Sequence, residues 1–263
     1  MVIIRMTGGL GNQMFQYALY QKLVSQGKEV KFDDKSEYTL ANARRIMLWA
    51  FGIDYPKATT AEIDKITDGS LKLSAKIRRK LFGRKSLKYN EKDCNFDAAV
   101  LGKEPAYLTG YFQSERYFKE VEDTVREAFT FDEAIFAGLE TELKNKITIY
   151  QIDIENTLSV SLHIRRGDYL SSADIYGGNC TEAYYAKAIE VMKHKYPEAV
   201  FYVFSNEDDW AEEWCKEQEL RTGAKFVPVT GVPEELGYLD MFLMSKCKHH
   251  IVANSSFSWW ERT

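Results

Sequence analysis

The sequence of 263 residues could form one large domain or two of ordinary size, and its composition, 45% hydrophobic and 28% charged, is typical of a globular protein. A formal net charge of −4 argues against a general nucleic-acid-binding protein. No apolar run reaches the ~20 residues that span a bilayer, and the apolar start is too short for a signal peptide. Four widely scattered cysteines predict reduced thiols, and together these features indicate a cytoplasmic protein without a transmembrane segment.

A Rossmann-like unit is predicted at the start of the chain. Residues 2–6 read as a short apolar strand, a glycine-rich loop (Gly8–Gln13) follows, then a helix to about Ser25 and a strand over 29–34. Backbone amides at such a loop can bind an anion, although a tight turn explains the glycines equally well. The loop matches neither the dinucleotide fingerprint nor the P-loop.

Residues 36–105 carry the weakest pattern. The stretch from Lys76 to Lys92 holds eight basic residues and one acid, which suits either an anionic membrane surface or, as the favoured interpretation, a solvated basic helix. A strand is expected over 107–111, and amphipathic stretches over 120–129 and 132–146. The polar segment Gln151–Asn156 is predicted to be a linker, which gives an N-terminal domain over 1–150 and a C-terminal domain over 157–263.

The second half of the chain alternates strands and helices. Strands are expected over 160–164, 199–204, 225–229 and 250–253, with helices over about 181–195, after a cap at Ser205 or Asn206, and over 234–245. Alternation of this kind predicts a parallel, doubly wound sheet. The predicted fold class is therefore α/β, with two Rossmann-like units.

Two of these strands end in residues suited to an anion. Arg165 and Arg166 follow the first strand, and Asn254–Ser258, with three serines, follows the last. Ligands of open α/β sheets bind beyond the carboxyl ends of the strands, and the arginine fork grips phosphate with two hydrogen bonds. A pyrophosphate site is predicted there, with a solvated strand end and an ordinary helix cap as the alternatives. Residues 166–168 also spell the cell-adhesion tripeptide Arg-Gly-Asp, which is weak evidence because it follows an apolar strand and does not lie in a long exposed loop.

Three segments resemble signatures of the bacterial α-1,2-fucosyltransferases of glycosyltransferase family 11. They are Gly8–Tyr17 (GGLGNQMFQY), His163–Tyr169 (HIRRGDY) and Asn254–Trp260 (NSSFSWW), in the family's order and spread over nearly the whole chain. The resemblance implies a GT-B fold, in which an N-terminal acceptor-side domain and a C-terminal GDP-fucose-binding domain face each other across a cleft. It also implies transfer of L-fucose from GDP-β-L-fucose to the 2-hydroxyl of a terminal β-galactoside, with inversion. No metal or other cofactor is expected, and no Asp-x-Asp occurs in the sequence.

The resemblance further assigns roles to individual residues. Arg165 would contact the β-phosphate, and Asp168 would act as the catalytic base or brace the arginines. His163 and Asp240 would lie near the ribose and guanine. Donor binding would also involve the following residues: Gly9, Gly11, Asn12, Arg166, Asn254, Ser255, Ser256 and Phe257.

Several alternatives stay open at this point. Another nucleotide sugar could be the donor, or the chain could be a non-catalytic form that binds a nucleotide or glycan. The basic segment leaves a peripheral contact with the inner membrane as an option. The family's chain continues past Trp260, so a short C-terminal segment is expected here, with an apolar patch at Trp259 and Trp260.

Overall fold

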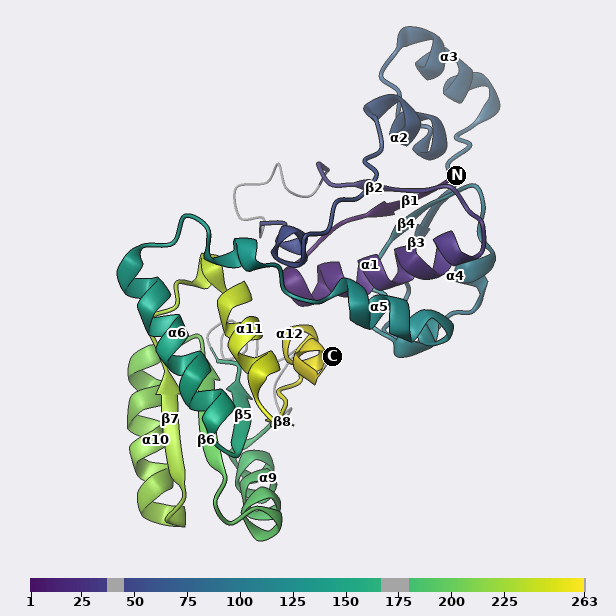
Figure 1. Cartoon of the computed structure of the whole chain (residues 1–263). Helices are drawn as coiled ribbons and strands as arrows, with labels where there is room; N and C mark the ends of the chain where they lie inside the picture. The colour runs from purple at the N-terminus through teal and green to yellow at the C-terminus, as the bar shows by residue number, and fades with distance from the viewer. Residues whose placement is uncertain (37–44, 167–179, 263) are drawn as a thin grey trace. The chain divides into compact units, whose positions relative to one another are not determined.

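The computed structural model describes residues 1–36, 45–166 and 180–262 (Figure 1). The chain divides into two compact units, Met1–Asp132 and Glu133–Thr263. Each unit contains one four-stranded parallel sheet with helices packed on it. The α/β class with parallel sheets is thus confirmed.

The sheet of the first unit has the order β2-β1-β4-β3. Its strands are β1 (Val2–Arg5), β2 (Val30–Asp33), β3 (Lys88–Asn90) and β4 (Ala106–Thr109). Ile4 pairs with Phe32 on one side and with Leu108 on the other, so β1 is internal and its apolar side chains are buried. The strand, glycine-rich loop, helix and strand expected at the start of the chain are confirmed, with α1 over Leu10–Ser25.

The other helices of this unit are η1 (Leu48–Phe51), α2 (Thr60–Thr67), α3 (Leu73–Phe82), α4 (Ala99–Gly102), η2 (Glu115–Tyr117), η3 (Lys119–Val121) and α5 (Glu122–Ala128). Aromatic residues join α1 to its neighbours, because Tyr17 packs against both Phe32 and Phe129. The strand β3 was not predicted, since three residues are too few to show an alternating pattern.

The sheet of the second unit has the order β7-β6-β5-β8. Its strands are β5 (Ser159–Ile164), β6 (Val200–Ser205), β7 (Lys225–Val229) and β8 (His249–Ile251). Its helices are η4 (Glu133–Phe136), α6 (Thr141–Asn156), α9 (Glu182–Lys195), α10 (Asp208–Thr222), η5 (Glu234–Leu236), α11 (Tyr238–Lys246), α12 (Ser256–Trp259) and η6 (Trp260–Arg262).

The prediction of a linker at Gln151–Asn156 was wrong. These residues form the last turns of α6, which belongs to the second unit and bonds to its sheet, where Tyr202 donates a hydrogen bond of 2.7 Å to Asp153. The segment looked like a linker because a helix on the surface carries many polar residues. The division between the units falls at Asp132 instead.

Two layers cover the sheet of the second unit. On one face, α9 and α10 pack Tyr185, Ile189 and Trp214 onto the apolar side of β5 and β6. The other face meets α6 and the C-terminal segment (Figure 1). Trp260 is only 1% exposed, so it forms part of this layer, and the apolar patch expected there is not found at Trp260.

Candidate functional site

The strand β5 carries polar side chains on a buried face. Ser159, Ser161 and His163 alternate with its apolar residues, as the sequence indicated, and all six residues of the strand are buried. Buried polar groups are costly unless they form hydrogen bonds. Each of these three side chains therefore needs a partner.

The partners all come from the C-terminal segment 248–261. The amide of Lys248 donates to Oγ of Ser159 at 3.2 Å, and the hydroxyl of Ser161 donates to Oε2 of Glu261 at 2.6 Å. Nδ1 of His163 bonds to the hydroxyl of Ser258. One face of β5 thus holds the serine-rich segment in a fixed register, which brings two of the three sequence signatures together at one end of the sheet.

His163 is held as a neutral imidazole. It is 6% exposed, and burial, with the charge of Arg165, lowers its pKa to about 3. The imidazole ring of His163 lies 5.7 Å from the ring of Phe257. The backbone carbonyl of His163 accepts a hydrogen bond of 3.1 Å from the hydroxyl of Tyr185. His163 therefore positions the Ser258 turn and adds no positive charge to the site.

The two arginines after β5 have different surroundings. Arg165 is half-buried and close enough to His163 to influence the pKa of its imidazole. Arg166 turns to α10, where its Nε lies 3.0 Å from Oε2 of Glu207 and its guanidinium stacks on Trp210 at 4.1 Å. Arg166 was predicted to bind the donor, but these contacts favour a bracing role for its guanidinium.

The loop before α10 differs from the expectation. Ser205 or Asn206 was predicted to cap this helix, but its N-cap is Glu207, which makes no capping hydrogen bond through its side chain. The side chain of Asn206 instead accepts a hydrogen bond of 2.9 Å from the amide of Arg166. The end of β6 therefore fixes the backbone that follows β5.

The serine segment forms a tight turn into α12. Ser255 is the N-cap, and its hydroxyl accepts a hydrogen bond of 3.2 Å from the amide of Phe257, as the predicted cap required. Asn254 is exposed, and its backbone amide donates a hydrogen bond of 3.1 Å to the thiol of Cys180. Ser256 is half-buried. The hydroxyl and backbone groups of this turn follow β8, the neighbour of β5.

Two further predicted residues have different outcomes. Asp240 lies in the first turn of α11, half-buried, and desolvation together with the charge of Asp208 raises its pKa to about 8. Its role near the nucleotide remains a prediction. Asp168, the candidate base, lies outside the described residues, as does most of the loop after β5.

The glycine-rich loop of the first unit is closely packed. Gly8 has φ +77°, and a Cβ there would lie 2.5 Å from Nδ2 of Asn12, so only glycine fits. Gly9 is the N-cap of α1 and Gly11 lies in its first turn. Asn12 accepts a hydrogen bond of 2.6 Å from Gln113. These residues belong to the other unit, so their contact with the donor stays a prediction.

Residues that brace this loop were missed. Gln13 and Gln16 are fully buried in α1. Gln13 donates to the carbonyl of Gly8 at 3.0 Å, and Gln16 bonds to both backbone groups of Thr7 and to the carbonyl of Gly110. The available signal was two glutamines on a helix that is otherwise apolar on that side, because such amides must find partners when buried.

The described residues include no group of three His, Cys, Asp or Glu side chains that could hold a metal ion. Arg165, the hydroxyls of the serine turn and the backbone amides are the groups of the second unit that the sequence analysis assigned to an anion. These groups are suited to a phosphate or diphosphate.

Comparison with known families decides the class of the protein. The profile of glycosyl transferase family 11 matches residues 1–262. The chain belongs to this family. It is therefore a glycosyltransferase, and the resemblance found in its three signatures is confirmed.

Two relatives from Escherichia coli cover almost the whole chain. An alpha-1,2-colitosyltransferase is 34% identical over 98% of this chain and 86% of its own. An O-antigen biosynthesis glycosyltransferase, WbnK, is 32% identical over 97% of this chain and 87% of its own. A galactoside alpha-(1,2)-fucosyltransferase 1 from Bos taurus is more distant, 26% identical over 60% of this chain and 43% of its own.

A solved structure has a similar fold. POFUT1 in complex with GDP has a TM-score of 0.50 and 9% sequence identity, and the match covers 99% of this chain and 93% of that chain. At this identity the likeness concerns the fold alone. The cleft between two domains that the resemblance implied remains a prediction.

The pairing of Ser161 with Glu261 generates a prediction about pH. The side chain of Glu261 is 0% exposed, its Oε1 has no partner in the described part of the chain, and burial raises the pKa of its carboxyl. A carboxyl whose pKa is raised in the folded state stabilises the fold at a pH below its pKa in the unfolded chain. This stabilisation is lost as the pH rises through its pKa in the folded state. The unfolding free energy of Glu261→Gln relative to the wild type should therefore rise with pH.

Denaturant unfolding followed by tryptophan fluorescence, between acidic and neutral pH, measures this difference. Glu217→Gln, an exposed position on α10, is the matched control and should give a difference that does not change with pH. A difference for Glu261→Gln that is flat or falls with pH would show that the buried carboxylate is well compensated.

Proposed function

We propose that this glycosyltransferase transfers L-fucose from GDP-β-L-fucose to the 2-hydroxyl of a terminal β-galactoside, with inversion, to give a Fucα1-2Gal linkage. The observation that carries the proposal is the set of hydrogen bonds between β5 and segment 248–261. Because of these bonds, the serine turn lies at the end of the sheet where Arg165 follows β5. Family membership and relatives named as α-1,2 transferases support the linkage.

In this scheme the second unit binds the donor. Arg165 lies at the end of β5 and the turn at Ser255–Phe257 follows β8, so both can approach one diphosphate from adjacent strands. Asp240 and His163 would lie toward the nucleoside. The Gly8–Asn12 loop of the first unit would face the fucose, and the first unit would bind the acceptor.

The reaction then needs little from the protein beyond orientation and charge stabilisation. The 2-hydroxyl of the galactoside attacks C1 of the fucosyl group, the bond from C1 to the β-phosphate oxygen breaks, and GDP leaves with the electron pair. The hydroxyl proton passes to a base, for which Asp168 is the candidate, or to water. Arg165 would stabilise the negative charge that develops on the leaving phosphate.

Colitose is a second candidate for the transferred sugar, because a relative at 34% identity is named an alpha-1,2-colitosyltransferase. Colitose is L-fucose without its 3-hydroxyl. A site built to bond that hydroxyl discriminates strongly against a sugar that lacks it, because a buried partner is left unpaired. The two candidates therefore differ in a measurable preference for the donor.

A donor panel tests the proposed function. Purified protein is incubated with lactose or N-acetyllactosamine and each of GDP-fucose, GDP-colitose, GDP-mannose and UDP-galactose, and NMR of the product gives the linkage. We expect turnover with GDP-fucose and a Fucα1-2Gal product. A preference for GDP-colitose would favour the second candidate, and turnover only with the other sugars would overturn the proposal.

Arg165 should act mainly in the transition state. A donor aimed at the leaving oxygen stabilises charge that is absent from the ground state, so Arg165→Ala should lower kcat about a hundredfold to a thousandfold with a smaller effect on the KM for GDP-fucose. Arg165→Lys should recover only part of this, because an ammonium cannot reproduce the two-pronged grip. Steady-state kinetics measures both.

Two variants serve as controls. Arg166→Ala should cost less activity, since its guanidinium contacts Glu207 and Trp210. Arg126→Ala, which removes an exposed ion pair on α5, should leave kcat unchanged. Near-normal kcat in Arg165→Ala with an inactive Arg166→Ala would reverse the roles of the two arginines.

Metal independence is a further part of the proposal. Activity should survive EDTA, because Arg165, serine hydroxyls and amides would supply the charge stabilisation that a divalent cation provides elsewhere. The measurement is the initial rate in EDTA against the rate with added Mg²⁺ or Mn²⁺. Loss of activity in EDTA with rescue by either cation would contradict this scheme.

A further inference from the structure

The helix α3 leaves its apolar residues in solvent. Leu73, Ile77 and Leu81 recur at the i, i+4 and i+8 positions that form one face of a helix, and they are 74%, 51% and 69% exposed. Leu71, 80% exposed, precedes the helix and Phe82, 71% exposed, ends it. None of the ten residues of α3 is buried.

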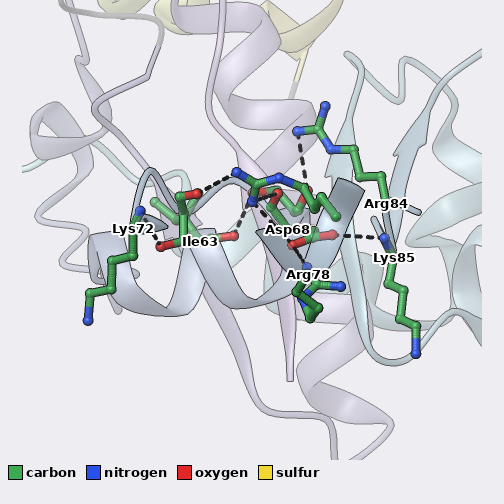
Figure 2. A network of polar contacts seen from close by, with 9 residues as sticks. Ile63, Asp68, Lys72, Arg78, Arg84 and Lys85 are labelled. Atoms are coloured by element: carbon green, nitrogen blue, oxygen red, sulfur yellow. Dashed lines mark hydrogen bonds and ion pairs between the residues drawn. The ribbon is translucent and has the colours of Figure 1, made fainter. Parts of the chain in front are cut away.

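The helix is attached through its basic residues instead (Figure 2). Arg78 bonds to the carboxylate of Asp68, the residue that ends α2, and Lys85, beyond the helix, donates its amide to the other carboxylate oxygen at 2.9 Å. Arg79 donates to the carbonyls of Asp68 and Ser70 at 3.0 and 2.7 Å. An amphipathic helix normally docks with its apolar face, so this attachment is reversed.

Asp68 is well suited to hold α3 with its arginines toward the protein and its apolar row toward solvent. Its side chain is 8% exposed, and the hydrogen bonds from Arg78 and the Lys85 amide lower its pKa to about 2, so it stays ionised at neutral pH. Because Arg78 and Arg79 are directed toward Asp68, the row formed by Leu73, Ile77 and Leu81 is directed elsewhere. The exposed apolar face thus follows from a specific polar anchor.

The surroundings of this face are strongly basic. Residues 72–88 contain eight basic side chains and no acidic one. Six of these side chains, other than the two arginines that contact Asp68, are exposed: Lys72, Lys76, Lys80, Arg84, Lys85 and Lys88. Lys76 and Lys80 lie one position before Ile77 and Leu81, so they flank the apolar row, from which their long stems can extend to a charged surface.

We propose that α3 docks on an anionic membrane surface, with Leu73, Ile77 and Leu81 inserted at the level of the headgroups and the flanking lysines on lipid phosphates. An apolar stripe bordered by lysines and arginines is the pattern of a helix that lies in the plane of the interface. If α3 stayed in water, its apolar residues would remain exposed, and a purely acidic partner would contact only its basic residues. An anionic membrane surface offers partners to both. None of the helices that the structure describes is long and apolar enough to cross a membrane.

Vesicle sedimentation of the full chain tests this inference, and it does not depend on the sugar that is transferred. We expect binding to phosphatidylcholine vesicles that contain phosphatidylglycerol, weak binding to phosphatidylcholine alone, and a decrease with added salt. Leu73→Ser/Ile77→Ser/Leu81→Ser should weaken binding about a hundredfold. Lys76→Gln/Lys80→Gln should weaken it about tenfold or more.

Matched controls lie on α10. Leu220→Ser, at a position 89% exposed, and Lys216→Gln, also exposed, change the same residue types outside the basic helix and should bind as the wild type does. Circular dichroism and transfer to a soluble acceptor should be unchanged in all these variants. Unchanged vesicle binding by the triple variant would overturn the proposal.

A second copy of the chain is the main competing occupant of this face. Light scattering of the free protein distinguishes it. A dimer that the triple serine variant dissociates, together with no binding to anionic vesicles, would show that the face is a protein interface and would refute membrane docking.

Discussion

The site depends on one constraint, the need to satisfy the polar side chains buried along β5. Ser159, Ser161 and His163 face the side of the sheet away from α9 and α10, and leaving them unpaired would cost the second unit a large part of its stability. Their partners all lie between residues 248 and 261. The same hydrogen bonds that stabilise the fold therefore place the serine turn beside the strand end that carries Arg165.

This arrangement explains why a signature contains a residue that touches no substrate in the proposed scheme. Ser258, within the last signature, pairs with His163, and Glu261, just after that signature, pairs with Ser161, so both act on the backbone geometry of the turn. In the same way Arg166, with Glu207 and Trp210, ties the end of β5 to α10. Such supporting contacts hold binding groups to the fractions of an ångström that catalysis requires.

Much of the second unit could be predicted from the sequence, because its strands are apolar runs and they alternate regularly with helices. The strand over 225–229 was placed correctly, and the helix expected over about 181–195 is α9. What could not be predicted is which polar residues meet. The alternation of β5 indicates one polar face, but only the fold shows that this face is buried against residues about a hundred positions away.

The failures have similar causes. The polar surface of α6 made a helix look like a linker, and β3 is too short for any periodicity. The basic character of α3 was visible in the sequence, yet its apolar row is informative only because Asp68 fixes the opposite side of the helix to the protein. A charge count cannot distinguish a solvated basic helix from one that presents leucines outward.

The account makes one claim about binding that a structure can test directly, namely that the donor diphosphate binds in the second unit at the ends of β5 and β8. The decisive measurement is a crystal structure of the full chain with GDP. We predict that the diphosphate contacts Arg165 and the turn at Ser255–Phe257. A diphosphate bound instead at the Gly8–Asn12 loop of the first unit would contradict the account.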